Sequence, residues 1–256
     1  MPQPDRRRAA LLLGVLLAAG GCSTAPRPSA NDAGSAIVQR SLNAAQLMLQ
    51  RGRPDEALVE AKKAVSADPR NGRARIAEAQ ALAALGRADE AGVAFERAAV
   101  LAPKDAVVLN AWGSWMCGAG KPIEALDAFA RALQDPTYRT PVQALANAGS
   151  CAAEAGRLET AEMNFRAALG MQPRHAQSLV GMARVELKRG NALGARGFLQ
   201  RREALAPLAQ SELMLGIEIE DAAGDRRAVE RYRQQLSALS RAGSADPSTA
   251  TGSSKQ

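Results

Sequence analysis

A repeat of 34 residues organises most of this 256-residue chain. Six related octapeptides, each with glycine at its third position, recur at steps of 34, 34, 36, 34 and 34 residues. Their glycines are Gly52, Gly86, Gly120, Gly156, Gly190 and Gly224. Prolines keep the same phase at Pro69, Pro103, Pro173 and Pro207, with Pro136 one place early. Two series in register indicate similar structural units, each stacked on its neighbours to bury a core.

Each unit is predicted to be a pair of helices. The chain is 46% hydrophobic but only 3% aromatic, so its core must consist mostly of alanine and leucine, which favour helices. A glycine between the helices accepts positive φ without a Cβ penalty, and a proline after the second helix ends it. Pro54 and Pro122 fit the first turn of a second helix, where a missing N–H costs nothing.

The period and the small and aromatic positions resemble the tetratricopeptide repeat, a helix-turn-helix unit of 34 residues. The six units begin at Val38, Gly72, Ala106, Val142, Ala176 and Gln210. The small residues where the two helices approach closely are Ala45, Ala79, Gly113, Gly149 and Ala183, and the alanines early in the second helix are Ala57, Ala91, Ala125, Ala161 and Ala195. The large core position is filled by Phe95, Phe129 and Phe165, and the alanine three residues after it by Ala64, Ala98, Ala132 and Ala168. The resemblance implies an all-α, right-handed superhelix of six repeats. The sixth departs from the motif at Val229, Arg233 and Leu236, as a terminal cap can.

The resemblance also implies a concave groove lined by positions 2, 5, 9 and 12 of the first helices, which receives a peptide or a helix. The predicted partner-binding residues are Gln39, Leu42, Gln46, Leu49, Arg73, Ile76, Gln80, Asn110 and Ser114. This early groove is apolar with glutamines, and it lacks the basic clamp that grips a C-terminal carboxylate. The alternative is that Leu42 and Ile76 only pack between repeats, because periodicity alone does not separate the two faces.

The centre of the chain is more distinctive than the repeat requires. It contains Leu109, Asn110, Trp112, Gly113 and Trp115, then DPTYRTP from 135 to 141, then Asn147-Ala-Gly before Cys151, and finally Leu213, Leu215, Gly216, Ile217 and Asp225. These features, in this order, resemble the PilF/PilW family of type IV pilus biogenesis lipoproteins. The resemblance implies an outer-membrane pilotin that binds a secretin subunit and supports its assembly or localisation and pilus stability. The alternative is a repeat scaffold for another envelope machine, for barrel insertion or peptidoglycan synthesis.

The N-terminus is predicted to be a lipoprotein signal. Three arginines at positions 6–8 precede an apolar run from Ala9 to Ala19, which is shorter than the ~20 residues of a membrane span. Ala19-Gly20-Gly21-Cys22 then resembles a lipobox, which implies lipidation of Cys22, and Ser23 after it implies the outer membrane, with the chain facing the periplasm. The alternative is a cysteine that falls by chance in an ordinary cleavage region.

Two cysteines remain after Cys22. Cys117 and Cys151 are at positions 12 and 10 of neighbouring first helices, in a chain expected in an oxidising compartment. The resemblance to the pilus family implies a disulfide between them. The alternative is a pair of small buried thiols.

The third unit carries two extra residues. They lie in the segment with Pro136, Tyr138 and Pro141, which cannot continue a helix. We expect an ordered loop pinned by Tyr138, or else a simple spacer.

No enzyme, cofactor or metal chemistry is predicted. His175 is the only histidine, and we expect it to be a solvated turn residue, so neither a histidine-based triad nor a His-rich metal site can form. Removal of residues 1–21 lowers the formal charge from +7 to +5, since three arginines and Asp5 are lost. The arginines are scattered, and no clustered basic face with aromatics indicates nucleic acid. A small-molecule substrate is not expected either.

These observations divide the chain into four predicted parts. Residues 1–21 form the signal peptide, residues 22–36 a lipidated N-terminus and flexible linker, and residues 37–242 the superhelix. Residues 243–256 are polar and are predicted to be a disordered tail.

Overall fold

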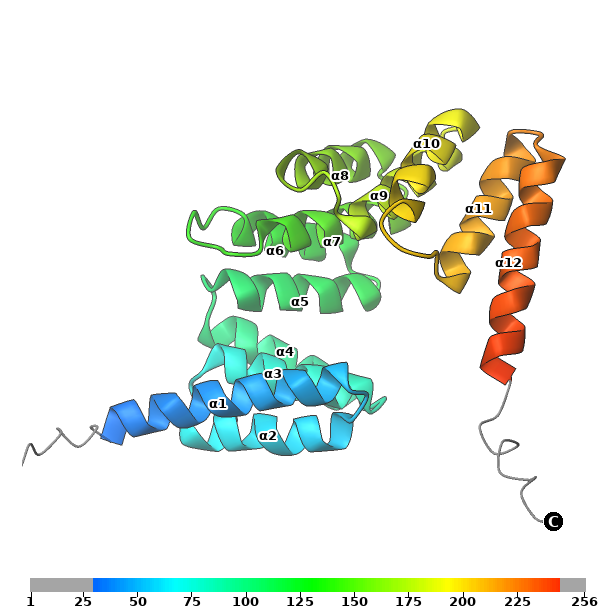
Figure 1. The fold of residues 1–256 in the computed structure, drawn as a ribbon. Helices are drawn as coiled ribbons and strands as arrows, with labels where there is room; N and C mark the ends of the chain where they lie inside the picture. The colour runs from blue at the N-terminus through cyan, green and yellow to red at the C-terminus, as the bar shows by residue number, and fades with distance from the viewer. Residues whose placement is uncertain (1–29, 245–256) are drawn as a thin grey trace, which may run out of the picture.

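The fold of residues 30–244, the part described by the computed structural model, consists of twelve α-helices and no strand (Figure 1). Consecutive helices pair into six antiparallel hairpins, α1 with α2 through α11 with α12. The helices are α1 Ala30–Gln50, α2 Pro54–Ala67, α3 Gly72–Ala84, α4 Ala88–Leu101, α5 Ala106–Gly118, α6 Pro122–Ala132, α7 Pro141–Glu154, α8 Leu158–Met171, α9 Ala176–Lys188, α10 Ala192–Glu203, α11 Gln210–Ala222 and α12 Arg226–Ser244. Among these residues, no helix is long and apolar enough to cross a bilayer.

The two ends of the fold differ from the predicted boundaries. Helix α1 begins at Ala30, so residues 30–36 are helical where a flexible linker was expected. Alanines at positions 30, 33 and 36, with no proline between positions 29 and 53, favour this extension. Helix α12 continues to Ser244, two residues beyond the predicted end of the superhelix. The predicted signal peptide, Cys22 and the tail after Ser244 lie outside the described residues.

Each hairpin turn is built on a glycine in the left-handed region. The six repeat glycines have φ between 68° and 78°, which confirms their predicted role. The residue after each glycine donates its backbone N–H to a carbonyl five residues earlier, as in Arg53 to Met48 and Arg87 to Leu82. This is the Schellman arrangement, which satisfies carbonyls at the end of the first helix and reverses the chain. Pro54 and Pro122 begin α2 and α6 as expected.

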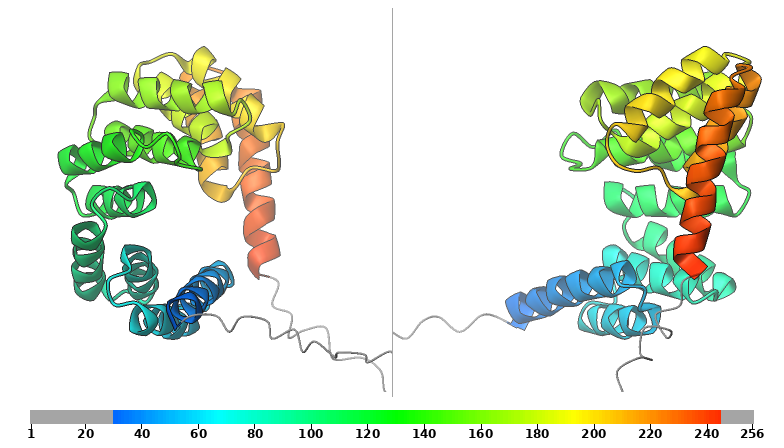
Figure 2. Two further views of the ribbon diagram at one scale, coloured as in Figure 1. Left: turned by 90° about the vertical axis from the view of Figure 1, so that its left-hand side faces the viewer. Right: turned by 45° about the vertical axis from the view of Figure 1, so that its right-hand side comes forward.

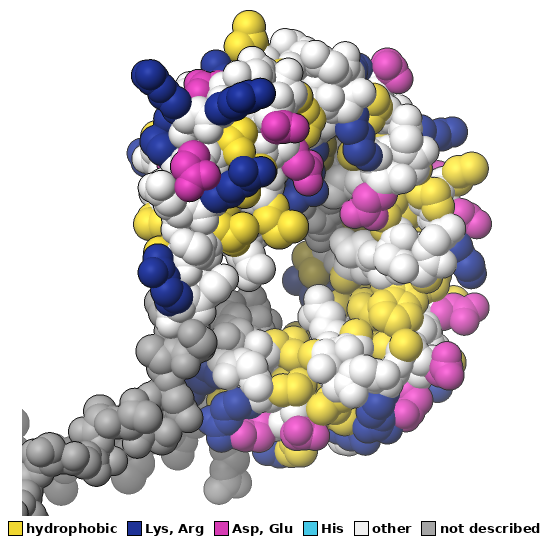
Figure 3. Space-filling model, turned by 90° about the vertical axis from the view of Figure 1, so that its right-hand side faces the viewer, with side chains coloured by type: hydrophobic (Ala, Val, Ile, Leu, Met, Phe, Trp, Pro, Cys, Tyr) yellow, Lys and Arg dark blue, Asp and Glu magenta, His cyan; other side chains and the backbone are white. Residues whose placement is uncertain are grey.

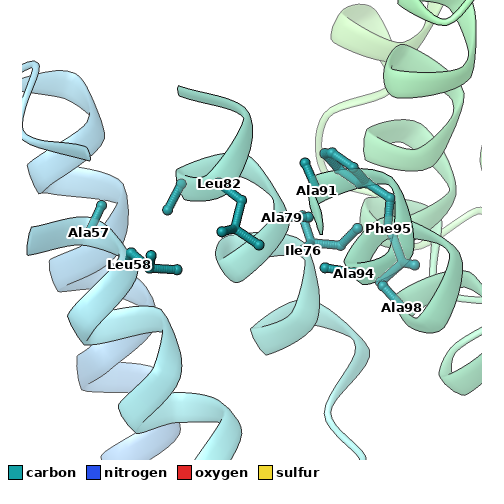
Figure 4. Close-up of a cluster of buried hydrophobic side chains, with 11 residues drawn as sticks. Ala57, Leu58, Ile76, Ala79, Leu82, Ala91, Ala94, Phe95 and Ala98 are labelled. Carbon is teal, nitrogen blue, oxygen red and sulfur yellow. The ribbon is translucent and has the colours of Figure 1, made fainter. Parts of the chain in front are cut away.

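Small residues allow the two helices of a hairpin to pack closely. Ala57, Ala91, Ala125, Ala161 and Ala195 are all fully buried. A Cβ on Gly113 would lie 2.9 Å from the ring of Phe129, and one on Gly149 would lie 2.7 Å from the ring of Phe165. Figure 4 shows the same principle in α2 to α4, where alanines surround Phe95 and Ile76. The predicted core positions of the repeat are therefore confirmed.

In the sixth hairpin, the small and aromatic core residues of the second helix lie one position earlier than the repeat predicts. Ala228 is 1% exposed and Tyr232 is 6% exposed. The ring of Tyr232 lies against Gly216, as Phe129 lies against Gly113. Burial raises the pKa of Tyr232 to about 12, with the Glu203 carboxylate as a further cause. The last hairpin therefore keeps the small-residue and aromatic pairing of the others.

The loop between α6 and α7 is ordered by two contacts. Tyr138 packs on Ala106, Leu109 and Ala132, and its burial raises the pKa of its hydroxyl. Asp135 accepts hydrogen bonds from the backbone N–H and the hydroxyl of Thr137, 2.8 and 2.7 Å away. The predicted pinning by Tyr138 is confirmed.

Candidate binding groove

The hairpins stack into a curved body whose concave side is formed by the first helices. Helices α1, α3, α5, α7 and α9 each contact the next first helix, whereas no second helix in the described part contacts another second helix. Figure 2 shows the result, a C-shaped arrangement with α1 and α12 at its two ends. Figure 3 shows the hollow itself, bordered largely by hydrophobic and uncharged side chains.

The predicted groove residues of α1 and α3 divide into two groups. Gln39, Gln46 and Gln80 are exposed, whereas Leu42 and Leu49 are half-buried. Ile76 is only 4% exposed and packs with Phe95 in the core, so its prediction as a groove residue is wrong. Ile76 therefore packs between repeats, as the alternative prediction states. Leu42 packs against two core clusters and leaves the rest of its side chain exposed to the groove.

Arg73 is exposed but is not a free cation of the groove. Its Nε donates to Oδ2 of Asp105 at 2.7 Å. Asp105 also accepts from the backbone N–H groups of Val107 and Val108 and thereby caps α5. Arg73 therefore joins the starts of α3 and α5.

The centre of the concave face carries a network of side-chain amides. Asn147 on α7 donates to Oδ1 of Asn110 at 3.1 Å and to the hydroxyl of Ser114 at 3.2 Å, both on α5. It accepts from Gln143 at 2.9 Å and from Gln177 of α9 at 3.3 Å. Gln143 also donates to Gln177 across 2.9 Å. Gln177 also donates to the hydroxyl of Ser150 at 3.4 Å. We call Asn110, Ser114, Gln143, Asn147, Ser150 and Gln177 the amide network.

The amide network can recognise a polypeptide backbone. Each carboxamide offers both N–H donors and a carbonyl acceptor, which match the groups of a peptide unit. Packed helices lie about 8–10 Å apart, and an extended chain advances about 3.3 Å per residue, so each first helix meets about every third residue of an extended segment. Because the network is uncharged, its hydrogen bonds rather than long-range attraction would hold such a segment.

A disulfide links α5 and α7 next to the amide network. Cys117 of α5 and Cys151 of α7 are joined in the structure, with their Cα atoms 5.8 Å apart. The bond lies about one helical turn beyond Ser114 and Asn147. It holds the two helices that carry most of the amide network at a fixed spacing.

The groove changes character toward the C-terminus. A cavity of about 410 Å³ lies between α7, α9 and α11, with Ser150 and Leu187 in its lining. Arg184, Lys188, Glu154 and Glu218 also line it, so charges of both signs replace the uncharged amides.

Sequence reasoning placed only part of this site. Asn110 and Ser114 lie in the amide network as predicted groove residues, whereas Asn147 and Gln177 were missed as groove residues. Gln177 could have been found, because it occupies position 2 of the fifth unit, 34 residues after Gln143. Asn147 lies one position beyond the groove register, and only its hydrogen bonds across α5, α7 and α9 identify it.

The fold and the groove define a tetratricopeptide-repeat protein. Tetratricopeptide-repeat sequence models match residues 48–111 and 142–175. No curated protein sequence matches the chain.

Solved structures give a more particular likeness. The chain is 28% identical to PilW, a widely conserved type IV pilus biogenesis factor, with a TM-score of 0.73 over 79% of this chain and 93% of PilW. Pseudomonas aeruginosa PilF is 24% identical, with a TM-score of 0.70 over 83% of this chain and 94% of its own. A tetratricopeptide repeat protein from Parabacteroides merdae is 15% identical, with a TM-score of 0.62 over 82% and 86% of the two chains. The latter two show the shared fold.

Proposed function

We propose that this protein is an outer-membrane lipoprotein that acts as a pilotin in type IV pilus biogenesis. It binds a secretin subunit and supports the assembly or localisation of the secretin and the stability of the pilus. The observation that carries the proposal is the likeness to PilW, which extends over nearly the whole of both folded chains. The fold adds that such stacked repeats serve as scaffolds for protein partners rather than as catalysts.

In this proposal the amide network receives an extended segment of the secretin subunit. The concave face offers donors and acceptors from three successive first helices, and the disulfide keeps α5 and α7 in register. A preorganised face loses less conformational entropy on binding than a flexible one.

Acyl chains on Cys22 provide the anchor. Two or more chains hold a protein stably at a membrane, whereas one chain binds only marginally. Tethering raises the effective concentration of the scaffold at the surface where the secretin ring forms.

Deletion of the gene in a piliated strain tests the proposal. We expect loss of SDS-resistant secretin multimers on immunoblots and loss of twitching motility, both restored by the wild-type gene. The Gln143→Ala/Gln177→Ala variant should restore neither fully, because it removes two members of the amide network. A matched control, Gln134→Ala/Gln200→Ala, changes two exposed glutamines outside the first helices and should restore both.

Unchanged multimers and motility in the deletion strain would overturn the pilotin role. Pull-down from solubilised membranes then separates the alternatives. A barrel-insertion or peptidoglycan-synthesis protein as the dominant partner would assign the scaffold to another envelope machine.

A further inference from the structure

Four unpaired cations mark the connections between hairpins. Arg70, Lys104, Arg139 and Arg174 each lie in a different connection, and each is exposed. Within the described residues, none of the four side chains forms a hydrogen bond or an ion pair. We call these four residues the basic edge.

The acidic residues of the same connections do not neutralise the basic edge by pairing with it. Asp68 accepts from the backbone N–H of Arg70 at 3.0 Å, and Asp135 accepts from that of Thr137. Asp105 caps α5 and pairs with Arg73. All three aspartates are only half-exposed, whereas the four cations are exposed.

The opposite edge, at the turns within hairpins, is organised differently. Arg53 pairs with Glu56, and Arg87 pairs with Glu90 at 2.6 Å. Figure 3, which views the molecule from this side, shows basic and acidic side chains interspersed. Arg51, Lys121 and Arg157 are exposed turn cations there that lack a side-chain partner within the described residues.

The basic edge is also the side from which the N-terminal segment leaves. Helices α3, α5, α7 and α9 begin directly after these connections. The start of α1 lies on the same side as the connections before α3, α5 and α7 (Figure 1). Ala30 follows Cys22 by eight residue steps, which span at most about 29 Å at 3.3–3.6 Å per residue. If Cys22 carries the acyl chains, as the proposed function holds, the bilayer lies within this distance of the start of α1.

We propose that the basic edge binds the anionic phospholipid headgroups of the membrane surface. This contact orients the superhelix with its first-helix starts toward the bilayer. The orientation part of the proposal rests on the lipid anchor of the proposed function, whereas the headgroup contact does not. A cation near an anionic surface strengthens binding about fivefold, so four cations give a substantial but salt-sensitive contact.

Vesicle co-sedimentation tests the contact without the anchor. The protein is the non-acylated chain from Ser23 to Gln256, which keeps every described helix and all core clusters. The vesicles are pure phosphatidylcholine, or phosphatidylcholine with about one third phosphatidylglycerol. We expect binding only to the anionic vesicles, and weaker binding as salt rises from about 50 to 500 mM.

Two variants with equal net charge distinguish binding through the basic edge from non-specific attraction between a positively charged protein and anionic vesicles. Lys104→Glu/Arg139→Glu should weaken binding at least about 25-fold, at about fivefold for each cation lost. Lys121→Glu/Arg157→Glu, on the opposite edge, should weaken it far less. Equal losses in both variants, or equal binding to neutral vesicles, would overturn the proposal. Neither result bears on secretin multimers in the deletion strain, so the two proposals fail independently.

Discussion

The protonation of one residue, His175, makes the stability of the fold depend on pH. It occupies the N-cap position of α9, and its Nδ1 lies 2.9 Å from the hydroxyl of Ser178, which is fully buried. The expectation of a solvated turn residue is wrong, because the side chain is half-buried. Burial lowers the pKa of His175, so the folded protein favours the neutral ring.

We predict that this histidine lowers stability in mild acid. Above the unfolded pKa of about 6.5 the ring is neutral in both states and has no effect. Below it, the unfolded chain binds the proton more readily, so the free energy of unfolding falls as pH decreases. His175→Asn should remove this dependence between pH 7.5 and 5.5 and raise stability by about 0.5–1 kcal/mol, since asparagine is a good N-cap. Asn71 caps α3 in this way, accepting from Ala74 at 3.1 Å.

Urea denaturation of both proteins at the two pH values is the measurement. Equal losses of stability in wild type and variant on acidification would contradict the role assigned to His175.

Ile76 shows what residue patterns leave undecided. It occupies a groove position by register, yet it is buried against Phe95. On a helix between two layers, residues about one turn apart can face either layer, and period alone does not choose between them.

At the scale of elements, close packing within a hairpin depends on glycines at particular positions. Gly113 and Gly118 lie in the same helix, α5, but in opposite environments. A Cβ on Gly113 would lie 2.9 Å from Phe129 and 3.1 Å from the carbonyl oxygen of Ala125. A Cβ on Gly118 would meet no atom within 4 Å.

We predict opposite effects of the same substitution at these two sites. Gly113→Ala should lower the free energy of unfolding by about 1–3 kcal/mol, because the backbone of α6 cannot move away cheaply. Gly118→Ala should raise it by up to about 1 kcal/mol, because alanine is the better helix former. Chemical denaturation followed by circular dichroism measures both. Similar changes at the two sites would mean that close packing does not determine the role of Gly113.

The helical hairpins could be predicted almost completely from the 34-residue period. The glycine turns, the buried alanines and the prolines at helix starts all lie where the sequence predicts them. The second helix of the sixth hairpin departs from the repeat, because Ala228 and Tyr232 occupy the small and aromatic core positions one residue early. Successive residues of a helix are rotated by about 100°. When core residues lie one position early, an alignment of fixed period therefore compares the wrong residues and does not identify the buried face.

At the scale of the whole molecule, the curvature is a consequence of unequal contacts. First helices touch their successors and second helices do not, so the stack bends toward the first helices. The sequence predicts a stack with a groove on this side, but the amide network depends on distances between three helices. Only the packing of α5, α7 and α9 against one another brings its side chains within hydrogen-bond distance.

In the proposed function, the concave face holds a segment of the secretin subunit. The most direct measurement is site-specific photocrosslinking in piliated cells, with p-benzoylphenylalanine in place of Ser114 in the groove or of Met163 on α8, whose side chain is 64% exposed. We expect a crosslink to the secretin from position 114 and none from position 163. Crosslinks from position 163 alone, or from position 114 only to proteins of another envelope machine, would contradict it.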